Sequence, residues 1–203
     1  AFVRPGLEQS GFPWLTLREQ ARLSHYRPRF VEPARPDKSA TLVRTPEGVE
    51  LDVADPVLAA ELGPEGLQAI RQDRGIFDTF PLALITTQTI TSLSAAVGVA
   101  LDVARFRPNF LIEAEGDAPF QEDAWLGAVL RIGSTRMRVD KRDGRCVVIT
   151  IDPQTGERDP VILRTVAQER QGYLGVYATT VQPGRCAVGD LVIIESEAQK
   201  RPS

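Results

Sequence analysis

The chain has 203 residues, of which 42% are hydrophobic and 25% charged, and its formal net charge is −3. This length is enough to bury a full hydrophobic core, and the composition is that of an ordinary globular protein. The slightly negative charge gives no general attraction to nucleic acid or to an anionic membrane surface. Apolar runs such as PLALI are too short to span a bilayer. We therefore expect neither nucleic acid nor a membrane among its partners.

The counts of cysteine and histidine set further limits. Cys146 and Cys186 can form at most one disulfide, and His25 is the only histidine. A single histidine excludes His-based catalytic triads and metal sites that need several histidines. The first residues, AFVRPGLEQSG, show no secretory signal. We therefore expect reduced thiols in the cytoplasm, and a metal only where a cofactor supplies most of its ligands.

Residues 1–75 are rich in proline and are expected to form an irregular β region. The segment WLTLREQARLSHYRPRFVEP at 14–33 predicts one or two short strands. The segment 40–53 predicts a hairpin with its turn at Pro46-Glu47-Gly48. These features indicate a small β subdomain.

Two helices are expected to start at capped positions. Asp55 can cap a helix that begins with Pro56, because an acidic cap and an early proline suit the first turn. This helix is interrupted near Gly63 but is expected to continue beyond it. Thr87 can cap a second helix, which ends at Gly98.

From residue 76 onward, short strands alternate with polar turns. We expect a short helix near 163–171 and strands at 80–86, 107–115, 125–133, 134–140, 145–152, 173–181 and 187–194. Such a series indicates a β-barrel decorated by helices. The expected fold class is mainly β with a few helices (α+β).

Five segments in this part occur in an order that resembles a known family. They are FRPNF (106–110), EDAWLG (122–127), RCVVITIDPQTGE (145–157), LGVYA (174–178) and PGRCAVGD (183–190). Together they resemble the MOSC domain, the C-terminal domain of molybdenum cofactor sulfurases. Within that family, the mitochondrial amidoxime reducing component and its bacterial relatives look most similar. The resemblance implies a MOSC-type β-barrel over 76–203, preceded by a partial N-terminal β-barrel-like region over 1–75.

The resemblance also implies a cofactor, a mononuclear molybdenum on a pyranopterin that is ligated by one cysteine thiolate. That cysteine matches Cys146, and a thiolate is a soft ligand suited to a redox metal. Lys141, Arg142 and Arg145 are expected to favour an anionic sulfur, whereas Asp143 opposes them. Arg145 is also expected to contact the pterin, and pyridoxal phosphate is not expected in this chain. The alternative is that Cys146 is a small buried apolar residue.

Arg107 and Asn109 match positions that contact the cofactor in the family. Arginine can hold the pterin phosphate through two parallel hydrogen bonds, and asparagine offers a donor and an acceptor to a heterocycle. Pro108 is expected to keep Arg107 extended. The alternative for Arg107 is a salt bridge to Glu122 or Asp123.

Three further polar residues and the second cysteine complete the set of candidates. Asp78 and Thr79 lie where the family places cofactor contacts, although short polar residues before a strand also form turns. Thr150 faces the site or is simply a β-branched strand residue. Cys186 stands where relatives carry an aliphatic residue, so we assign it to packing.

The implied function is a molybdenum-dependent oxidoreductase that removes oxygen from N-hydroxylated small molecules. Two cysteines cannot hold an iron–sulfur cluster, so a separate electron-donor protein with flavin, haem or iron–sulfur is expected. One alternative is a non-catalytic carrier of the molybdenum cofactor or its sulfur. Another is a structural remnant, because the sequence lacks the Pro-Val-Lys-Ser-like strand and the Gly-Asp-Arg turn through which relatives hold the cofactor phosphate.

Overall fold

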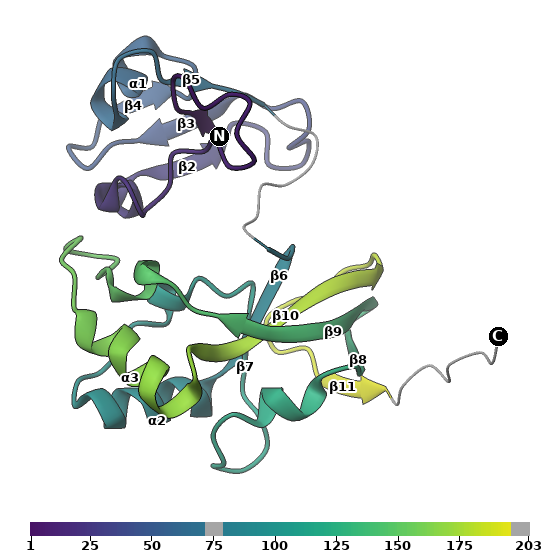
Figure 1. Ribbon diagram of the computed structural model, residues 1–203. Helices are drawn as coiled ribbons and strands as arrows, with labels where there is room; N and C mark the ends of the chain where they lie inside the picture. Colours follow the sequence, from purple (N-terminus) through teal and green to yellow (C-terminus); the bar gives the residue numbers. More distant parts are fainter. Residues whose placement is uncertain (72–78, 196–203) are drawn as a thin grey trace. The chain divides into compact units, whose positions relative to one another are not determined.

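The computed structural model describes residues 1–71 and 79–195 (Figure 1). By residue contacts the chain forms two compact units: Ala1–Ile76 with Ile151–Arg158, and Phe77–Thr150 with Asp159–Ser203. The structure is mainly β with three α-helices, which confirms the predicted fold class. No helix among the described residues combines the length and the apolar character needed to cross a membrane.

The first unit is built on two small antiparallel sheets. The larger has the strand order β2-β3-β4, and the smaller pairs β1 with β5. The strands are β1 (Phe2–Val3), β2 (Arg27–Phe30), β3 (Thr41–Arg44), β4 (Glu50–Asp52) and β5 (Gln68–Ala69). Thr45 N donates to Val49 O at 2.8 Å and so closes the turn between β3 and β4. The predicted hairpin is therefore confirmed.

The helix α1 (Pro56–Leu62) begins as predicted, with the Asp55 carboxylate accepting from Val57 N at 2.8 Å. The helix ends at Leu62. The expected continuation beyond Gly63 was wrong, because Gly63 is extended and Gln68–Ala69 form β5. The side chains buried in the core of this unit are Val43, Leu58, Leu62 and Leu67.

The second unit is built on a six-stranded sheet in the order β11-β8-β9-β10-β6-β7. Its strands are β6 (Leu82–Thr86), β7 (Phe110–Ile112), β8 (Val129–Ile132), β9 (Thr135–Gly144), β10 (Tyr173–Gln182) and β11 (Val192–Glu195). All neighbours are antiparallel except β6 and β7. Register shifts interrupt the β9–β10 pairing and bend the strands. The sheet curls into a half-barrel (Figure 1).

Two α-helices belong to this unit. The chain runs from β6 into α2 (Thr87–Val97), and α3 (Pro160–Arg170) leads into β10. The N-cap of α2 is Thr86 rather than Thr87, and its hydroxyl accepts from the backbone of Thr89. Gly98 ends α2 in the left-handed region at φ 83°, as predicted. The 3-10 helices within residues 1–71 and 79–195 are η1 (Ala21–His25), η2 (Val103–Phe106), η3 (Gln121–Trp125) and η4 (Val147–Thr150).

The segment 145–152, predicted as a strand, is not one. Val147–Thr150 form the 3-10 helix η4, and Ile149 N donates to Cys146 O at 3.2 Å. The β propensity of its valines and isoleucine takes effect only where a strand is packed beside neighbours. β9 ends at Gly144, and Ile151 pairs with Arg158 in an isolated bridge rather than in a strand.

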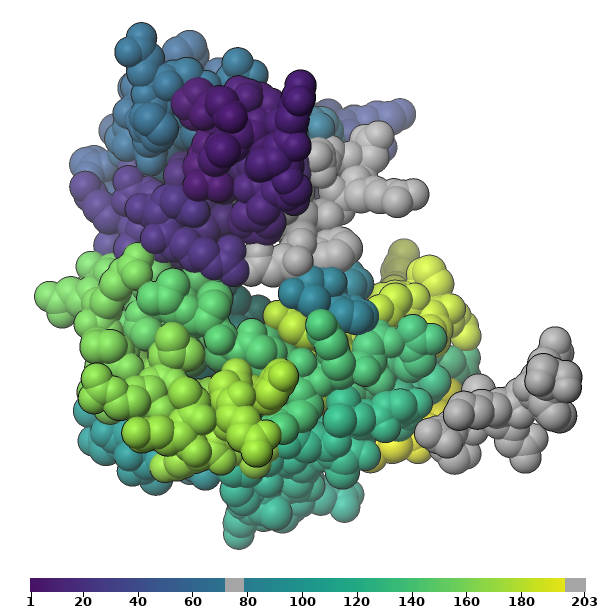
Figure 2. All heavy atoms as spheres, in the orientation of Figure 1, coloured from purple at the N-terminus to yellow at the C-terminus, as the bar shows by residue number. Residues whose placement is uncertain are grey.

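The sheet of the second unit has a hydrophobic cluster on each face. Successive residues of β6 point to opposite faces, as in any strand. Leu84 therefore lies in a cluster with Trp125, and Ile85 lies in another with Phe106 and residues of α2 and α3. In the space-filling view, α3, drawn in light green, lies at the surface of the second unit (Figure 2). The loop that carries Cys146 joins β9 to η4.

Candidate functional site

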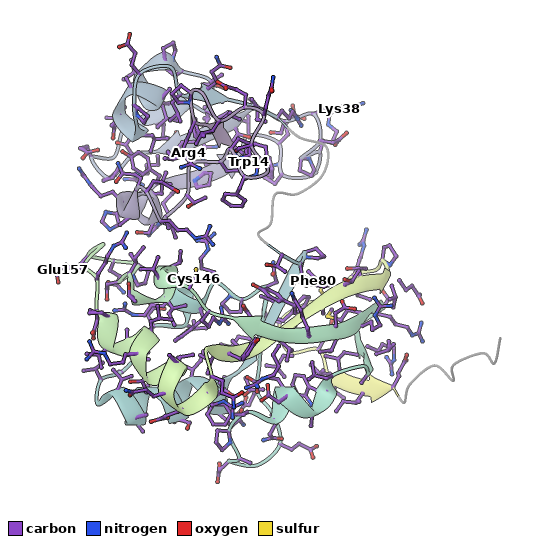
Figure 3. The ribbon with its side chains drawn as sticks, viewed as in Figure 1. Arg4, Trp14, Lys38, Phe80, Cys146 and Glu157 are labelled. Carbon is purple, nitrogen blue, oxygen red and sulfur yellow. The ribbon has the colours of Figure 1, made fainter. Side chains whose placement is uncertain are left out.

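Cys146 lies between β9 and η4, is half-buried and forms no disulfide. The residue is labelled in Figure 3. The backbone is held on both sides of the thiol. Arg145 N donates to Gly172 O at 2.8 Å, and Cys146 O accepts from Ile149 N at 3.2 Å. The sulfur is therefore presented from a connection with a fixed conformation.

The neighbouring Arg145 has a buried guanidinium, with only 7% of its side chain exposed. Its Nε donates to Leu174 O at 2.7 Å, and its Nη1 donates to Phe106 O at 3.0 Å. Nη1 also lies 2.9 Å from Asp143 Oδ2. Burial lowers the pKa of Arg145, and the Asp143 carboxylate opposes that shift. Arg145, which the sequence analysis assigned to the pterin, is therefore already bound by Leu174, Phe106 and Asp143.

One nitrogen of this guanidinium is left over. Nη2 of Arg145 is buried and has no hydrogen-bond partner among the described residues. It lies beside Gly175, which has φ +77° and whose Cβ, if present, would stand 3.2 Å from Nη2. An unsatisfied charged donor is costly when buried, so this nitrogen is suited to an acceptor from outside the described chain.

The charges around the site are arranged differently from the sequence prediction. The lowered pKa of Arg145 is opposed most by Asp143, and then by Tyr177, Cys146 and Glu122. Cys146 and Arg145 therefore interact electrostatically. Lys141 and Arg142, which were also expected to favour the thiolate, have other contacts. Lys141 Nζ lies 5.1 Å from the ring centre of Phe80, and Arg142 Nε lies 3.4 Å from Asp123 Oδ1.

Tyr177 is a site residue that the sequence analysis missed. It lies near Thr79 and near the Asp143 carboxylate. Its pKa is raised, mainly by burial and then by Asp143. Its ring stacks on Phe80 with centroids 5.7 Å apart. The only signal in the sequence was its place in LGVYA, which marked the family without giving the tyrosine a role.

Arg107 is exposed and lies in the left-handed region, at φ 51° and ψ 43°. The expectation that Pro108 keeps Arg107 extended was wrong. A following proline disfavours the right-handed helical region, and Arg107 ends the helix η2 by donating its N–H to Ala104 O. The left-handed region avoids the right-handed helical angles that Pro108 disfavours, and it still lets Arg107 N donate to Ala104 O. A non-glycine residue at positive φ is strained and persists where its surroundings fix it.

Asn109 links the segment after Arg107 to the start of β6. Its Oδ1 accepts from Ala83 N at 2.9 Å, and its own N donates to Ala83 O at 2.8 Å. The side-chain oxygen that was assigned to the heterocycle is therefore engaged, and the amide nitrogen remains as the group for a cofactor contact.

The two carboxylates proposed as alternative partners of Arg107 bind elsewhere. Glu122 is fully buried and accepts from the hydroxyls of Thr86 at 2.8 Å and Thr89 at 2.9 Å. Asp123 pairs with Arg142 and Arg170. The salt-bridge alternative for Arg107 was therefore wrong.

The remaining predicted residues have different surroundings. Thr150 is buried, and its hydroxyl donates to Val147 O at 2.7 Å within η4. A contact from Thr150 to the cofactor stays a prediction. Thr79 lies near Tyr177. Asp78 lies outside the described residues.

Cys186 does not pack as expected, because it is exposed. Its loop is bound to the turn between β8 and β9, where Ser134 N donates to Arg185 O at 3.0 Å. The backbone of this loop makes the close contacts, since a Cβ on Gly184 would meet Ser134 O at 2.5 Å. The side chain of Cys186 is thereby left toward solvent.

The site offers a metal one soft ligand. Within residues 1–71 and 79–195, no three His, Cys, Asp or Glu side chains gather as a metal-binding group. A metal at Cys146 must therefore bring its other ligands with it. A thiolate donor, an adjacent buried guanidinium with an unpartnered nitrogen and a glycine beside it fit a metal carried on an organic cofactor.

Relatives of this chain include two kinds of protein. It is 29% identical to molybdenum cofactor sulfurase from Drosophila erecta over 170 residues, which cover 71% of this chain and 21% of that protein. It is 32% identical to mitochondrial amidoxime-reducing component 1 from Xenopus laevis over 104 residues, which cover 49% of this chain and 29% of that protein. The chain thus spans about a fifth of the sulfurase it matches.

Solved structures and a family model give further matches. YiiM from Geobacillus stearothermophilus aligns with a TM-score of 0.45 and 16% identity, covering 56% of this chain and 53% of that chain. The MOSC domain family model matches residues 71–193, which is more than half of the sequence. The chain belongs to the MOSC domain family.

Proposed function

We propose that this chain binds a mononuclear molybdenum cofactor, with the Cys146 thiolate as its protein ligand. The observation that carries the proposal is the position of Cys146, half-buried on a fixed connection beside the buried Arg145 guanidinium. Membership of the MOSC family and relatives named for molybdenum cofactor sulfuration and amidoxime reduction support a role related to this cofactor.

The donors around Cys146 suit the organic part of such a cofactor. Nη2 of Arg145, for which the described part of the chain supplies no hydrogen-bond partner, would donate to an acceptor on the pterin. Arg107, exposed on a strained turn, would bind the phosphate, because a guanidinium pairs two donors with two phosphate oxygens. The amide nitrogen of Asn109 would donate to the heterocycle, and Thr79, which lies near Tyr177, would contact the cofactor as well. Asp78 and Thr150 stay candidate contacts.

The proposed reaction is the reduction of N-oxygenated small molecules. When bound, the cofactor supplies a metal that changes oxidation state and can take oxygen from an N-hydroxyl group. Release of that oxygen as water consumes two electrons and two protons, and the electrons must come from a separate flavin, haem or iron–sulfur protein. The residues of this chain would hold the cofactor, orient the thiolate and limit access of water. We propose that the reaction takes place in the cytoplasm.

A second candidate is a non-catalytic carrier of the molybdenum cofactor or its sulfur. The observation that favours it is the similarity to molybdenum cofactor sulfurases, which extends over 71% of this chain. The two candidates share the same cofactor site and differ only in turnover.

The test is expression of the chain in a cofactor-competent host, followed by molybdenum and pterin analysis. We expect stoichiometric molybdenum in the wild type, loss of the metal in Cys146→Ser, and retention in Cys186→Ser, the matched control with an exposed thiol. Metal retained in Cys146→Ser would overturn the ligand assignment. Turnover of an amidoxime with a chemical reductant separates the enzyme from the carrier.

A further inference from the structure

Three paired residues form a row across the sheet of the second unit. Ala83 of β6 is paired with Tyr177 of β10, and Tyr177 is paired with Lys141 of β9. Residues directly opposite each other in paired strands have their side chains on the same face of the sheet. The side chains of Tyr177 and Lys141 are therefore neighbours on the face that also carries Ala83.

The buried guanidinium of Arg145 lies on this face as well. A Cβ on Gly175 would stand 3.2 Å from Arg145 Nη2 and 3.4 Å from the Cβ of Ile85. Ile85 comes two residues after Ala83 in β6, so both point to the same face. Gly175 comes two residues before Tyr177 in β10, and two residues of a strand span about 7 Å. The row therefore lies next to the nitrogen that is suited to a ligand.

The ammonium group of Lys141 is held by a pair of aromatic rings. Its Nζ lies 5.1 Å from the centre of the Phe80 ring. Phe80 is stacked on Tyr177, with ring centroids 5.7 Å apart and an interplanar angle of 19°. A cation is attracted to the face of an aromatic ring, but the ring does not neutralise its charge. Lys141 is therefore positioned before any ligand binds, and its charge remains available.

Among the described residues, no carboxylate forms an ion pair with Lys141, and the lysine is exposed. The acidic residues on either side of it in β9 pair with other cations. Asp140 pairs with Arg138, and Asp143 pairs with Arg145. A lysine ammonium makes strong, charge-assisted hydrogen bonds to a carboxylate. Lys141 is thus suited to an anionic group on a ligand of the neighbouring site.

We propose that Lys141 is a specificity-determining residue, which binds a carboxylate on the N-oxygenated substrate. This inference rests on the proposed function, in which the N–O group is reduced beside Cys146. Adjacent strands are about 4.8 Å apart, so the backbone of Lys141 lies on the order of 8 Å from that of Gly175. A substituted aromatic ring has about this length. The preferred substrates are therefore small molecules with an N-oxygenated group at one end and a carboxylate at the other.

The experiment compares benzamidoxime with 4-carboxybenzamidoxime in cofactor-loaded protein, with a chemical reductant. Lys141→Met removes the charge and keeps the length of the side chain, and Lys38→Met is the control at an exposed lysine of the first unit. In the wild type we expect kcat/KM to be about tenfold higher for the carboxylate compound, the effect of one charge-assisted hydrogen bond. Lys141→Met should lose this preference through KM, with the neutral compound unaffected. Lys38→Met should match the wild type.

A second measurement needs no turnover. The wild-type protein is acetylated with a lysine-specific reagent, and the rate at each lysine is followed by mass spectrometry. Saturating 4-carboxybenzamidoxime should slow the acetylation of Lys141, whereas benzamidoxime should not. Lys38 is the internal reference and should react at the same rate with either compound.

The outcomes separate this inference from the proposed function. Protein that reduces neither amidoxime would contradict the proposed function and leave the acetylation test in force. An equal preference in wild type and Lys141→Met, or equal acetylation of Lys141 with both compounds, would overturn the role of Lys141. Loss of molybdenum from folded Lys141→Met would assign the lysine to the cofactor phosphate, and this too would overturn its role toward the substrate.

Discussion

Gly175 lies against Arg145 so closely that a Cβ on the glycine would stand 3.2 Å from the arginine Nη2. The same Cβ would stand 2.6 Å from Leu84 O on the neighbouring strand. Gly175 also has φ +77°, a region that side chains other than glycine enter only with strain. The approach of β10 to β6 at this point and the place of the guanidinium therefore depend on one missing side chain.

Gly175→Ala is expected to lower the free energy of unfolding of the second unit by about 2–5 kcal/mol, from left-handed strain and overpacking together. The matched control is Gly98→Ala, which has φ +83° but no atom within 4 Å of the added Cβ, so only about 1–2 kcal/mol is lost. Urea unfolding followed by Trp125 fluorescence, in a Trp14→Phe background, measures both. Equal losses would show that the close approach is absent.

Asp143→Asn should be strongly destabilising, because it leaves the buried Arg145 cation without its carboxylate. The expected loss is about 3–5 kcal/mol. Asp140→Asn is the control on the same strand: Asp140 pairs with Arg138 at 2.7 Å, but the arginine side chain is 55% exposed, so its loss should stay below about 1 kcal/mol. If Asp143→Asn also costs less than about 1 kcal/mol, the buried pair between Asp143 and Arg145 does not form.

Thr89→Val tests the buried carboxylate of Glu122. The Thr89 hydroxyl donates to Glu122 Oε2 at 2.9 Å and accepts from Phe120 N at 2.8 Å. An isosteric valine removes both bonds and should cost about 1–3 kcal/mol. Thr91→Val on the same helix removes an exposed bond to Thr87 O and should change stability by no more than about 0.5 kcal/mol. Chemical denaturation measures the stability of both variants. Equal losses in Thr89→Val and Thr91→Val would contradict the prediction.

The first unit should lose stability at alkaline pH through Tyr26. Burial, followed by the hydrogen bond to Glu61, raises the pKa of Tyr26 from 10.0 to about 12. Because the pKa of Tyr26 is higher in the folded state, its stabilisation of the first unit is complete below the unfolded-state pKa of 10.0. This stabilisation disappears as the pH rises from 10.0 to about 12. Tyr26→Phe should remove this loss, and Glu61→Gln should narrow its pH range. The measurement is unfolding free energy against pH from Trp14 fluorescence; an unaltered alkaline limb in Tyr26→Phe would contradict it.

Signals between residues close in sequence gave correct predictions. Asp55 and Gly98 act at the ends of their own helices, and the turn at 45–49 closes on itself. Cap and turn residues act through hydrogen bonds or backbone angles within a few positions. The sequence was therefore sufficient for most of the strands and for the order of the helices.

Predictions that depended on distant partners were less complete. The β-branched residues after Cys146 indicated a strand, but Val147–Thr150 form the 3-10 helix η4. Asp143 was read as a charge near the thiol, whereas the structure pairs it with Arg145 and places Tyr177 near it. The contact between β9 and β10 that brings Tyr177 there depends on the register of the sheet. Register with its bulges is set by packing over the whole sheet.

The short stretch Ile151–Arg158, grouped by its contacts with Ala1–Ile76, bears on how this gene can be divided. A fragment that stops at the end of the N-terminal region would lack residues 151–158, which pack against that region. It would also lose the hydrogen bond from Arg158 Nη2 to Arg18 O at 3.0 Å. A transplanted C-terminal fragment would expose residues 151–158 to solvent. Recombination between relatives therefore has to exchange residues 1–76 and 151–158 together. A single crossover between the two units would separate these two segments.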